Sequence, residues 1–205
     1  MKTLLRIDAS ASPADSVSQQ LADDFVARWL QNEPNGKVIQ RDLNQQTPEH
    51  LSPEMLGALF ASEPTAAQKH LFQFADELIT EIEAADMLLI STPMYNFGIP
   101  STLKAYFDHI ARAGRTFQYT ENGPEGLLIR KSAVAIISSG GDYRQPPLNQ
   151  MNFVDGYLQT FLGFIGIQDV HLMHAAGLAM EGRAELAVAE AQQKIVEYFA
   201  ETAAA

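Results

Sequence analysis

Apolar residues are distributed along the chain in two alternating patterns. Short runs rich in Leu, Ile and Val predict buried strands, whereas apolar residues at helical spacing predict amphipathic helices. The expected strands are Thr3–Ala9, Lys37–Leu43, Met87–Ser91, Lys131–Ser138 and Asp169–Met173. The expected helices are Ser16–Gln31, a short one near Pro53–Phe60, Ala66–Ala84, Ser101–Ala113, Asn152–Phe164 and Glu185–Thr202.

This alternation predicts an α/β fold. Five short apolar strands separated by helices are typical of a five-stranded parallel sheet with helices on both faces. No repeat, low-complexity tract or linker divides the chain, so residues 1–205 are expected to form a single domain. Arg115–Ile129 departs from the alternation and is interpreted as a hairpin or flap. Open parallel sheets bind ligands outside the carboxyl ends of their strands, and the loops there are therefore the candidate site.

The loop after the first strand carries Ser10, Ser16 and Ser18 and leads into a helix. The N–H groups of a helix's first turn, together with its dipole, favour a phosphate. Ser16 and Gln19 also fit a capping box, so the alternative that Ser16 is only an N-cap stays open. The loop lacks GxxxxGK and GxGxxG, which argues against nucleoside-triphosphate and Rossmann dinucleotide turns. Asp15 is expected to face solvent, because a carboxylate beside a phosphate is unfavourable.

The loop after the third strand, Pro93–Pro100, concentrates Met94, Tyr95, Asn96 and Phe97 between prolines. Aromatic and thioether side chains can flank a planar ring, while backbone amides and the Asn96 side chain can bond its polar edge. The simpler alternative is a hydrophobic loop packed on the core.

The loop after the fourth strand contains Ser138, Ser139, Gly140 and Gly141. Paired glycines allow the backbone to approach a ligand closely or to adopt a positive φ, although an ordinary turn is the alternative. This loop is a candidate because it is the third such loop on one edge of the predicted sheet.

Composition narrows the class of protein. The chain has 205 residues, of which 46% are hydrophobic and 19% charged, and this is a globular composition. It has no cysteine, which removes disulfides, Fe–S clusters and thiolate nucleophiles, and its five histidines include no HExxH motif, so no metal site is expected. The net charge of −11 argues against nucleic acid and anionic membranes as partners. The amino terminus lacks the apolar region of a signal peptide, and the apolar runs are shorter than the about 18 residues of a membrane span, so a soluble, cytoplasmic protein is expected.

Two longer stretches carry a family resemblance. Pro93–Asp108 (PMYNFGIPSTLKAYFD) and Phe117–Leu127 (FQYTENGPEGL) resemble the FMN-dependent NAD(P)H azoreductases, also called FMN-dependent NADH:quinone oxidoreductases. The resemblance runs from the first strand to the last helix and implies a flavodoxin-like fold. It implies three sets of cofactor-binding residues: Ser10, Ser16, Val17 and Ser18 for the FMN phosphate; Met94, Tyr95, Asn96 and Phe97 for the flavin; and Ser138, Ser139, Gly140 and Gly141 for the isoalloxazine edge.

Two positions depart from the family pattern. Val17 stands where the family often has a polar residue, a change that a backbone N–H contact survives and a side-chain contact does not. Ser139 stands where the family often has Arg, so no cationic role is assigned to it.

The resemblance also implies a homodimer with active sites at the subunit interface. The partner subunit would then help to cover the flavin, and four apolar residues are candidates for the substrate pocket: Phe60, Phe117, Tyr119 and Phe164. For each of them, an ordinary core or surface position is the alternative.

The implied activity is the transfer of two electrons from NADH or NADPH, through bound FMN, to quinones and aromatic azo compounds by a ping-pong mechanism. The flavin N5 carries the hydride, so no side chain is expected to be catalytic. Backbone N–H groups of the Met94–Phe97 and Gly140–Gly141 loops are expected to stabilise the negative charge of the reduced flavin. The scarcity of basic residues favours NADH as the donor.

Two other functions are alternatives. A flavodoxin-like electron carrier shares the fold and the acidic charge, but it would be shorter, would carry a TGxT-type first loop and would stabilise a one-electron semiquinone. A hydrolase on a similar sheet would need a GxSxG nucleophile elbow, which the sequence lacks.

Overall fold

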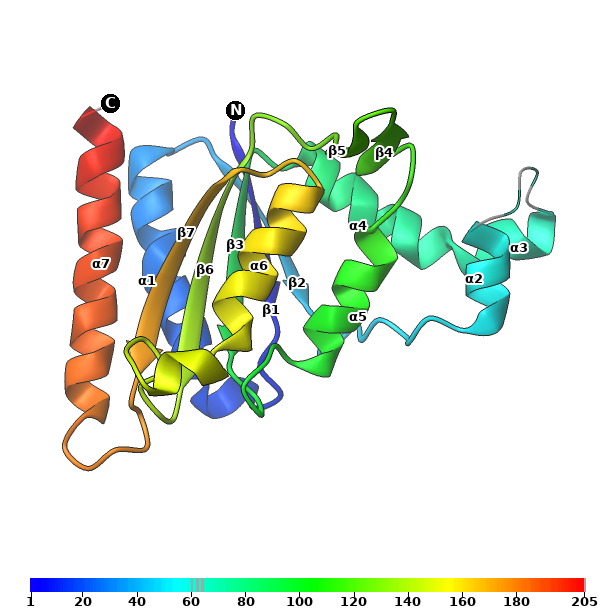
Figure 1. Cartoon of the computed structure of the whole chain (residues 1–205). Coiled ribbons are helices and arrows are strands. Elements are labelled where there is room, and N and C mark those ends of the chain that lie inside the picture. The colour runs from blue at the N-terminus through cyan, green and yellow to red at the C-terminus, as the bar shows by residue number, and fades with distance from the viewer. Residues whose placement is uncertain (60, 62, 64, 205) are drawn as a thin grey trace.

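A five-stranded parallel sheet forms the centre of the molecule (Figure 1). The computed structural model describes residues 1–59, 61, 63 and 65–204. The strands are β1 (Thr3–Asp8), β2 (Lys37–Asp42), β3 (Met87–Pro93), β6 (Ser132–Ser139) and β7 (Asp169–Ala176), in the order β2-β1-β3-β6-β7. The chain therefore leaves β1 toward β2 and returns to β3 on the other side of β1. This reversal is the topological switch point at which open α/β sheets bind ligands.

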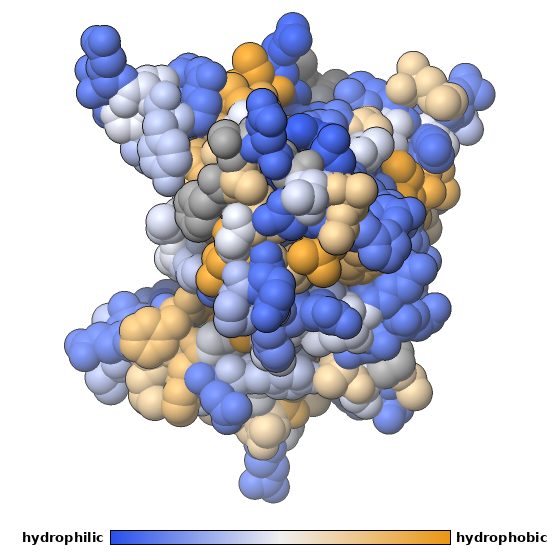
Figure 2. Space-filling model, turned by 90° about the vertical axis from the view of Figure 1, so that its right-hand side faces the viewer, coloured by the Kyte–Doolittle hydropathy of each residue, from blue (hydrophilic) through white to orange (hydrophobic). Residues whose placement is uncertain are grey.

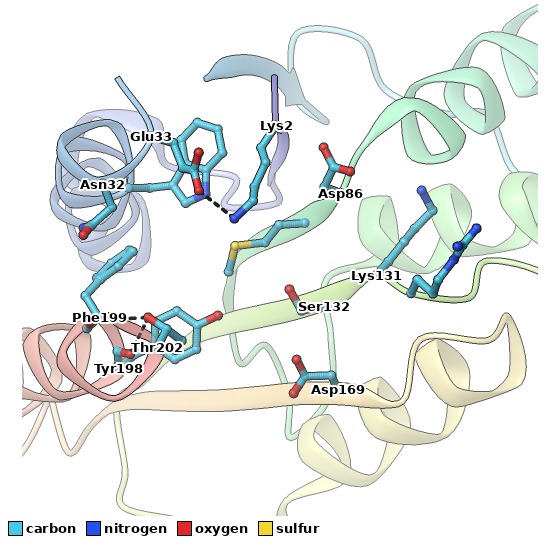
Figure 3. A pocket seen from close by; sticks show the side chains of 13 residues that line it. Lys2, Asn32, Glu33, Asp86, Lys131, Ser132, Asp169, Tyr198, Phe199 and Thr202 are labelled. Carbon is cyan, nitrogen blue, oxygen red and sulfur yellow. Dashed lines mark hydrogen bonds and ion pairs between the residues drawn. The ribbon is translucent and has the colours of Figure 1, made fainter. Parts of the chain in front are cut away.

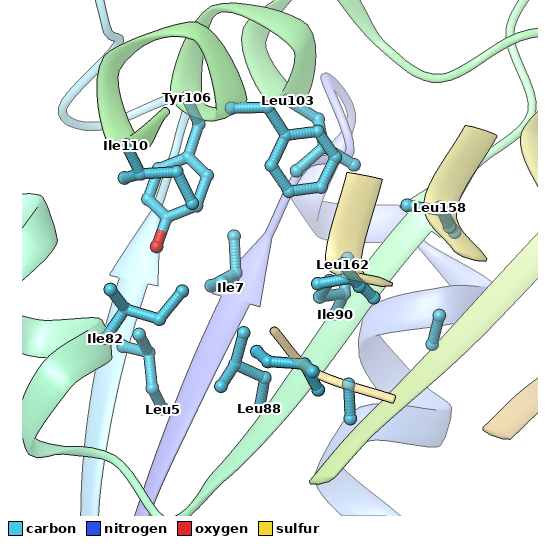
Figure 4. Close-up of a cluster of buried hydrophobic side chains, with 14 of the residues drawn as sticks. Leu5, Ile7, Ile82, Leu88, Ile90, Leu103, Tyr106, Ile110, Leu158 and Leu162 are labelled. Atoms are coloured by element: carbon cyan, nitrogen blue, oxygen red, sulfur yellow. The ribbon is translucent and has the colours of Figure 1, made fainter. Parts of the chain in front are cut away.

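Helices cover both faces of the sheet, as predicted. α1 (Val17–Asn32) and α7 (Ala184–Ala204) lie on one face, and α4 (Gln73–Ala84), α5 (Ser101–Ile110) and α6 (Phe153–Phe164) lie on the other. Successive strand side chains point to opposite faces, so Leu4 packs with α1 and α7 while Leu5 packs with α4, α5 and α6. Figure 4 shows the second of these clusters, in which Tyr106 and Leu103 of α5 lie over Ile7.

The expected long helix over Ala66–Ala84 is wrong as a single element. It breaks at Phe72 into α3 (Ala66–Leu71) and α4, with φ −95° and ψ −6° at the break. At this point the residue that faces the core is Phe72, whereas continuous helical spacing would place Leu71 there. Phe72 is buried against the guanidinium of Arg112, whose Cζ lies 4.1 Å from the ring centroid, whereas Leu71 is exposed.

The remaining elements lie outside the sheet. α2 (Pro53–Leu59) and α3 extend away from the body of the molecule, as the cyan helices in Figure 1 show. The predicted hairpin is confirmed as antiparallel β4 (Phe117–Thr120) and β5 (Gly123–Gly126). Two single-turn 3-10 helices, Pro13–Asp15 and Leu148–Met151, precede α1 and α6.

Candidate functional site

The three loops singled out in the sequence meet at the carboxyl edge of the sheet. Strand register places Pro93 of β3 opposite Ser138 of β6, and the Met94 N–H donates to the Ser138 carbonyl at 2.8 Å. On the other side of β3, the Ala9 N–H donates to the Ser91 carbonyl at 2.9 Å. The loops after β1, β3 and β6 are thereby joined at the switch point.

The first loop supplies buried hydroxyl groups at a helix N-terminus. Ser10, Ser16 and Ser18 are all buried, and the Ser16 and Ser18 hydroxyl oxygens lie 3.2 Å apart. Ser16 caps α1 by accepting the Gln19 N–H at 3.3 Å, which confirms the N-cap, whereas no bond from the Ser16 N–H to the Gln19 side chain completes the expected capping box. α1 begins at Val17, whose N–H belongs to the first turn and has no intrahelical acceptor. The cap and an anion site are compatible, because a hydroxyl has both a donor and two acceptor positions. Asp15 is exposed, as expected.

The second loop is a tight turn that the sequence did not reveal. The N–H and carbonyl groups of Tyr95 and Gly98 bond reciprocally at 2.9 and 3.0 Å. Between them, Asn96 and Phe97 have φ values of 49° and 70°. Asn adopts such a conformation readily, but Phe does so at a cost, and strain of this kind is concentrated at functional sites. The Tyr95 hydroxyl accepts the Ala11 N–H at 3.2 Å and ties this turn to the first loop.

The third loop contacts the second through a residue that sequence reasoning missed. The ring of Tyr143 meets the ring of Phe97 edge-on, with centroids 5.8 Å apart. A Cβ on Gly141 would lie 2.9 Å from the same tyrosine ring, so a larger residue there would displace the ring. The Ser139 hydroxyl donates to the Gly141 carbonyl at 2.8 Å, which turns the loop back on itself. An aromatic residue two positions after paired glycines was the only signal for Tyr143.

Charged side chains beside the third loop compensate one another. Arg144 donates to both oxygens of Asp142 at 2.8 and 2.6 Å, and these bonds lower the pKa of Asp142 to about 2. Arg183 pairs with Glu190 at 2.6 Å. Both guanidinium groups are therefore held by carboxylates, and hydroxyl and backbone N–H groups are the donors that the three loops themselves offer to an anion.

A buried carboxylate, also missed in the sequence, fastens three strands beneath the loops. Asp8 is 1% exposed and accepts hydrogen bonds from Arg6 Nε at 3.0 Å, Ser91 Oγ at 2.7 Å and Gln40 Nε2 at 2.8 Å. These partners come from β1, β3 and β2, so the network fixes the spacing of the strands at the switch point.

The candidate substrate-pocket aromatics lie elsewhere in the protomer. Phe117 packs against Phe164 with centroids 4.5 Å apart and against Tyr119 at 5.4 Å. Phe164 ends α6, whereas Phe153 at its start donates its N–H to the Phe97 carbonyl. At 1.5 Å per residue, the two ends of α6 are about 16 Å apart. The aromatic cluster thus lies toward the amino edge of the sheet, and Phe60 lies outside the described residues.

Two cavities bear on the location of the site. One of about 580 Å³ adjoins the second loop and is lined by Tyr95, Asn96, Phe153, Tyr157 and Lys104, among others. A larger one, of about 720 Å³, opens at the opposite edge of the sheet (Figure 3). The carboxyl edge remains the better candidate for a phosphorylated cofactor, because the helix N-terminus, the strained turn and the paired glycines meet there.

In the part of the chain that the structure describes, no three His, Cys, Asp or Glu side chains lie close enough together to hold a metal ion. None of the described helices combines the length and apolar character required to cross a membrane.

A family model and similar curated proteins indicate the same family. A family model described as having a flavodoxin-like fold matches residues 1–199. A protein of Hydrogenovibrio crunogenus named FMN-dependent NADH:quinone oxidoreductase is 51% identical over 181 residues, which cover 87% of this chain and 90% of that protein. A protein of Marinomonas sp. with the same name is 49% identical over 197 residues, covering 95% and 98%.

Solved structures of azoreductases superpose on nearly the whole chain. An azoreductase from Bacillus anthracis superposes with a TM-score of 0.89 at 25% identity, covering 97% of this chain and 98% of that one. An FMN-dependent NADH-azoreductase from the same species, solved in complex with FMN, gives a TM-score of 0.88 at 27% identity, covering 98% and 99%.

Proposed function

The chain belongs to the flavodoxin-like family of FMN-dependent NADH:quinone oxidoreductases, and we propose that the three loops at its carboxyl edge hold the FMN. It is an NADH-dependent flavoenzyme that reduces quinones and aromatic azo compounds. The observation that supports this assignment of the site is the convergence of the three loops at the switch point.

The residues present fit FMN in charge and in shape. Ser18 is fully buried at the start of α1, where its hydroxyl and the first-turn N–H groups form a donor set suited to a phosphate. Phe97 and Tyr143, whose rings meet edge-on, offer apolar surface to a planar ring, and the paired glycines let it approach the backbone closely. When bound, FMN supplies hydride transfer at its N5.

Each loop then has a distinct task. Ser10, Ser16, Ser18 and the Val17 N–H bind the phosphate, and Val17 contributes only through its backbone. The Met94–Phe97 turn and the Ser138–Gly141 loop hold the ring system. The N–H groups of Met94 and Tyr95 bond the Ser138 and Gly98 carbonyls, so those of Asn96, Phe97, Gly140 and Gly141 stabilise negative charge that develops on the ring. No side-chain nucleophile is needed, and the product takes its protons from solvent.

NADH and the acceptor use one slot in turn, which gives ping-pong kinetics. NADH is the preferred donor, because a 2′-phosphate needs a free cation, whereas Arg144 and Arg183 are held by Asp142 and Glu190. Measured initial rates at several fixed quinone concentrations should give parallel double-reciprocal lines, with NADPH much slower than NADH. Intersecting lines would rule out the ping-pong order. FMN binding without NADH oxidation would favour the electron-carrier alternative.

The active enzyme is a homodimer in the cytoplasm, where NADH is available. The Phe117–Phe164 cluster is too distant to cover the loops of its own protomer, but the cluster of a second copy can do so. Tyr119 is 77% exposed and Ile129 is 61% exposed, as expected for residues that a partner covers. Figure 2 shows further apolar side chains, in orange, scattered among polar ones on the face that includes α2 and α3.

The dimer is tested by sedimentation velocity with wild type and Tyr119→Ser. We expect a dimer for the wild type, and for the variant a weaker dimer with reduced quinone turnover at low protein concentration. A fully active monomer would contradict the shared site.

A further inference from the structure

The groove at the amino edge of the sheet has no part in the flavin site. It has a volume of about 720 Å³ and lies between the C-terminal ends of α1 and α7 and the first residues of β3, β6 and β7 (Figure 3). Met87 and Ser132 lie at its base. The FMN loops are at the other end of these same strands, so the groove and the flavin site are separated by the length of the sheet.

One wall of the groove is aromatic. Trp29 of α1 and Tyr198 and Phe199 of α7 line it, and the rings of Tyr198 and Phe199 meet edge-on at 5.3 Å. Burial raises the pKa of the Tyr198 phenol, so this ring stays neutral. Faces of neutral aromatic rings bind apolar groups and attract organic cations.

Helix ends give the groove a partial negative charge. α1 and α7 both end at it, and neither carries a basic residue in its last turn. The terminal carbonyl groups of each helix amount to about half a negative charge.

Two carboxylates add to this charge. Asp86 accepts the Thr3 N–H through Oδ2 at 2.7 Å, and Asp169 bonds His171 through Oδ1 at 2.9 Å. Each carboxylate has a second oxygen, and each stands at the start of a strand that lines the groove.

The cations of the groove are mostly compensated. Lys2 pairs with Glu33 at 2.6 Å. Lys131 donates to the carbonyl groups of Glu83 and Ala85 at the C-terminus of α4, and Asp86 attracts its charge. Arg130 is exposed at the outer rim. The three cations balance the three carboxylates that line the groove, so the two helix ends, in a protein of net charge −11, leave its inner part favourable to positive charge.

From this combination we propose that the groove is a second ligand site, which binds a protonated primary amine carrying an aromatic or apolar body. The body lies against Trp29, Tyr198 and Phe199, and the ammonium group lies between Asp86 and Asp169. The site is independent of the flavin and of the quinone.

The chain offers a local reporter, because Trp29 is its only tryptophan. FMN-loaded enzyme is titrated with three ligands of similar size, which are 2-phenylethylamine, 2-phenylethanol and 3-phenylpropionate, while Trp29 emission is followed. We expect a saturable change with the amine and binding at least about fivefold weaker for the alcohol and the acid, because only the amine forms charge-assisted bonds. Equal or tighter binding of the acid, or no saturable change with the amine, would overturn the proposal.

Variants locate the bound amine. Asp86→Asn keeps an acceptor for the Thr3 N–H and Asp169→Asn keeps one for His171, so both should fold, and each should weaken amine binding about threefold to tenfold. Glu185→Gln changes the net charge equally at the far end of α7 and should leave binding unchanged.

Enzyme activity separates this site from the flavin site. Saturating amine should leave the NADH:quinone rate unchanged. Competition between amine and quinone, or equal effects of all three variants, would place the amine elsewhere and refute the second site.

Discussion

Removing the Ser18 hydroxyl should weaken FMN binding without unfolding the protein. The Ser18 side chain is fully buried in the first turn of α1, and its oxygen lies 3.2 Å from that of Ser16. Ala suits a helix at least as well as Ser, so Ser18→Ala should leave the stability of the apoprotein within about 1 kcal/mol. Ser16→Ala would also remove the N-cap, at about 1 kcal/mol of stability.

The magnitude follows from the charge of the phosphate. A hydrogen bond to a charged group contributes roughly 1.5–3 kcal/mol, and each 1.4 kcal/mol is a factor of ten in affinity. Ser18→Ala should therefore raise the Kd for FMN about 10-fold to 150-fold. Riboflavin has the same ring system without the phosphate, so its Kd should change less than about threefold.

The assay is parallel titration of apoprotein with FMN and riboflavin, followed by flavin fluorescence. Thr80→Ala is the control, because it removes a helical hydroxyl of α4 that lies outside the three loops. Unchanged FMN affinity in Ser18→Ala, or an equal loss for riboflavin, would refute the assignment of the phosphate to this loop.

Three further predictions concern the turn at the flavin, the core and the pH response. Phe97→Gly relieves a φ of 70°, which costs an L-residue about 1–2 kcal/mol, but it also loses the ring contact with Tyr143, which is of similar size. The stability of the apoprotein should therefore stay within about 1 kcal/mol of wild type, while the Kd for FMN in fluorescence titration rises about tenfold. Gly36→Ala places a Cβ 2.4 Å from the Trp29 ring and should lower the free energy of unfolding by about 1–3 kcal/mol in urea, whereas an unchanged midpoint would contradict the packing. Arg144 lowers the pKa of Asp142 from its ordinary 3.8 to about 2, so this pair stabilises the fold above pH 3.8 and loses that contribution as the pH falls toward 2. The difference in Tm between wild type and Asp142→Asn should therefore disappear between pH 3.8 and pH 2. A difference in Tm that does not depend on pH would contradict this prediction.

Strand and helix positions could be predicted because the side chains that face the core recur at the spacing of the strand or helix that carries them. Leu21, Phe25 and Trp29 repeat at helical spacing, and all three pack on the sheet. The break at Phe72 could not be predicted, since Leu71 and Phe72 are both apolar and only tertiary packing decides which one is buried.

The loops of the candidate site could be found from composition and from their place after strands. Their internal geometry could not be predicted. The positive φ of Phe97 contradicts local preference and is held by the bonds between Tyr95 and Gly98. Asp8 was missed because nothing in a single strand indicates that Ser91 and Gln40 will lie beside it.

The most direct test of the central claim is the dependence of quinone reduction on FMN. Flavin is stripped from the purified protein, and NADH oxidation with a small quinone is measured as FMN is added back. We predict no turnover in the apoprotein and a rise that saturates at one FMN per chain, with Ser18→Ala shifted to higher FMN concentration. Turnover without FMN, or failure of the protein to bind FMN, would contradict the three-loop site.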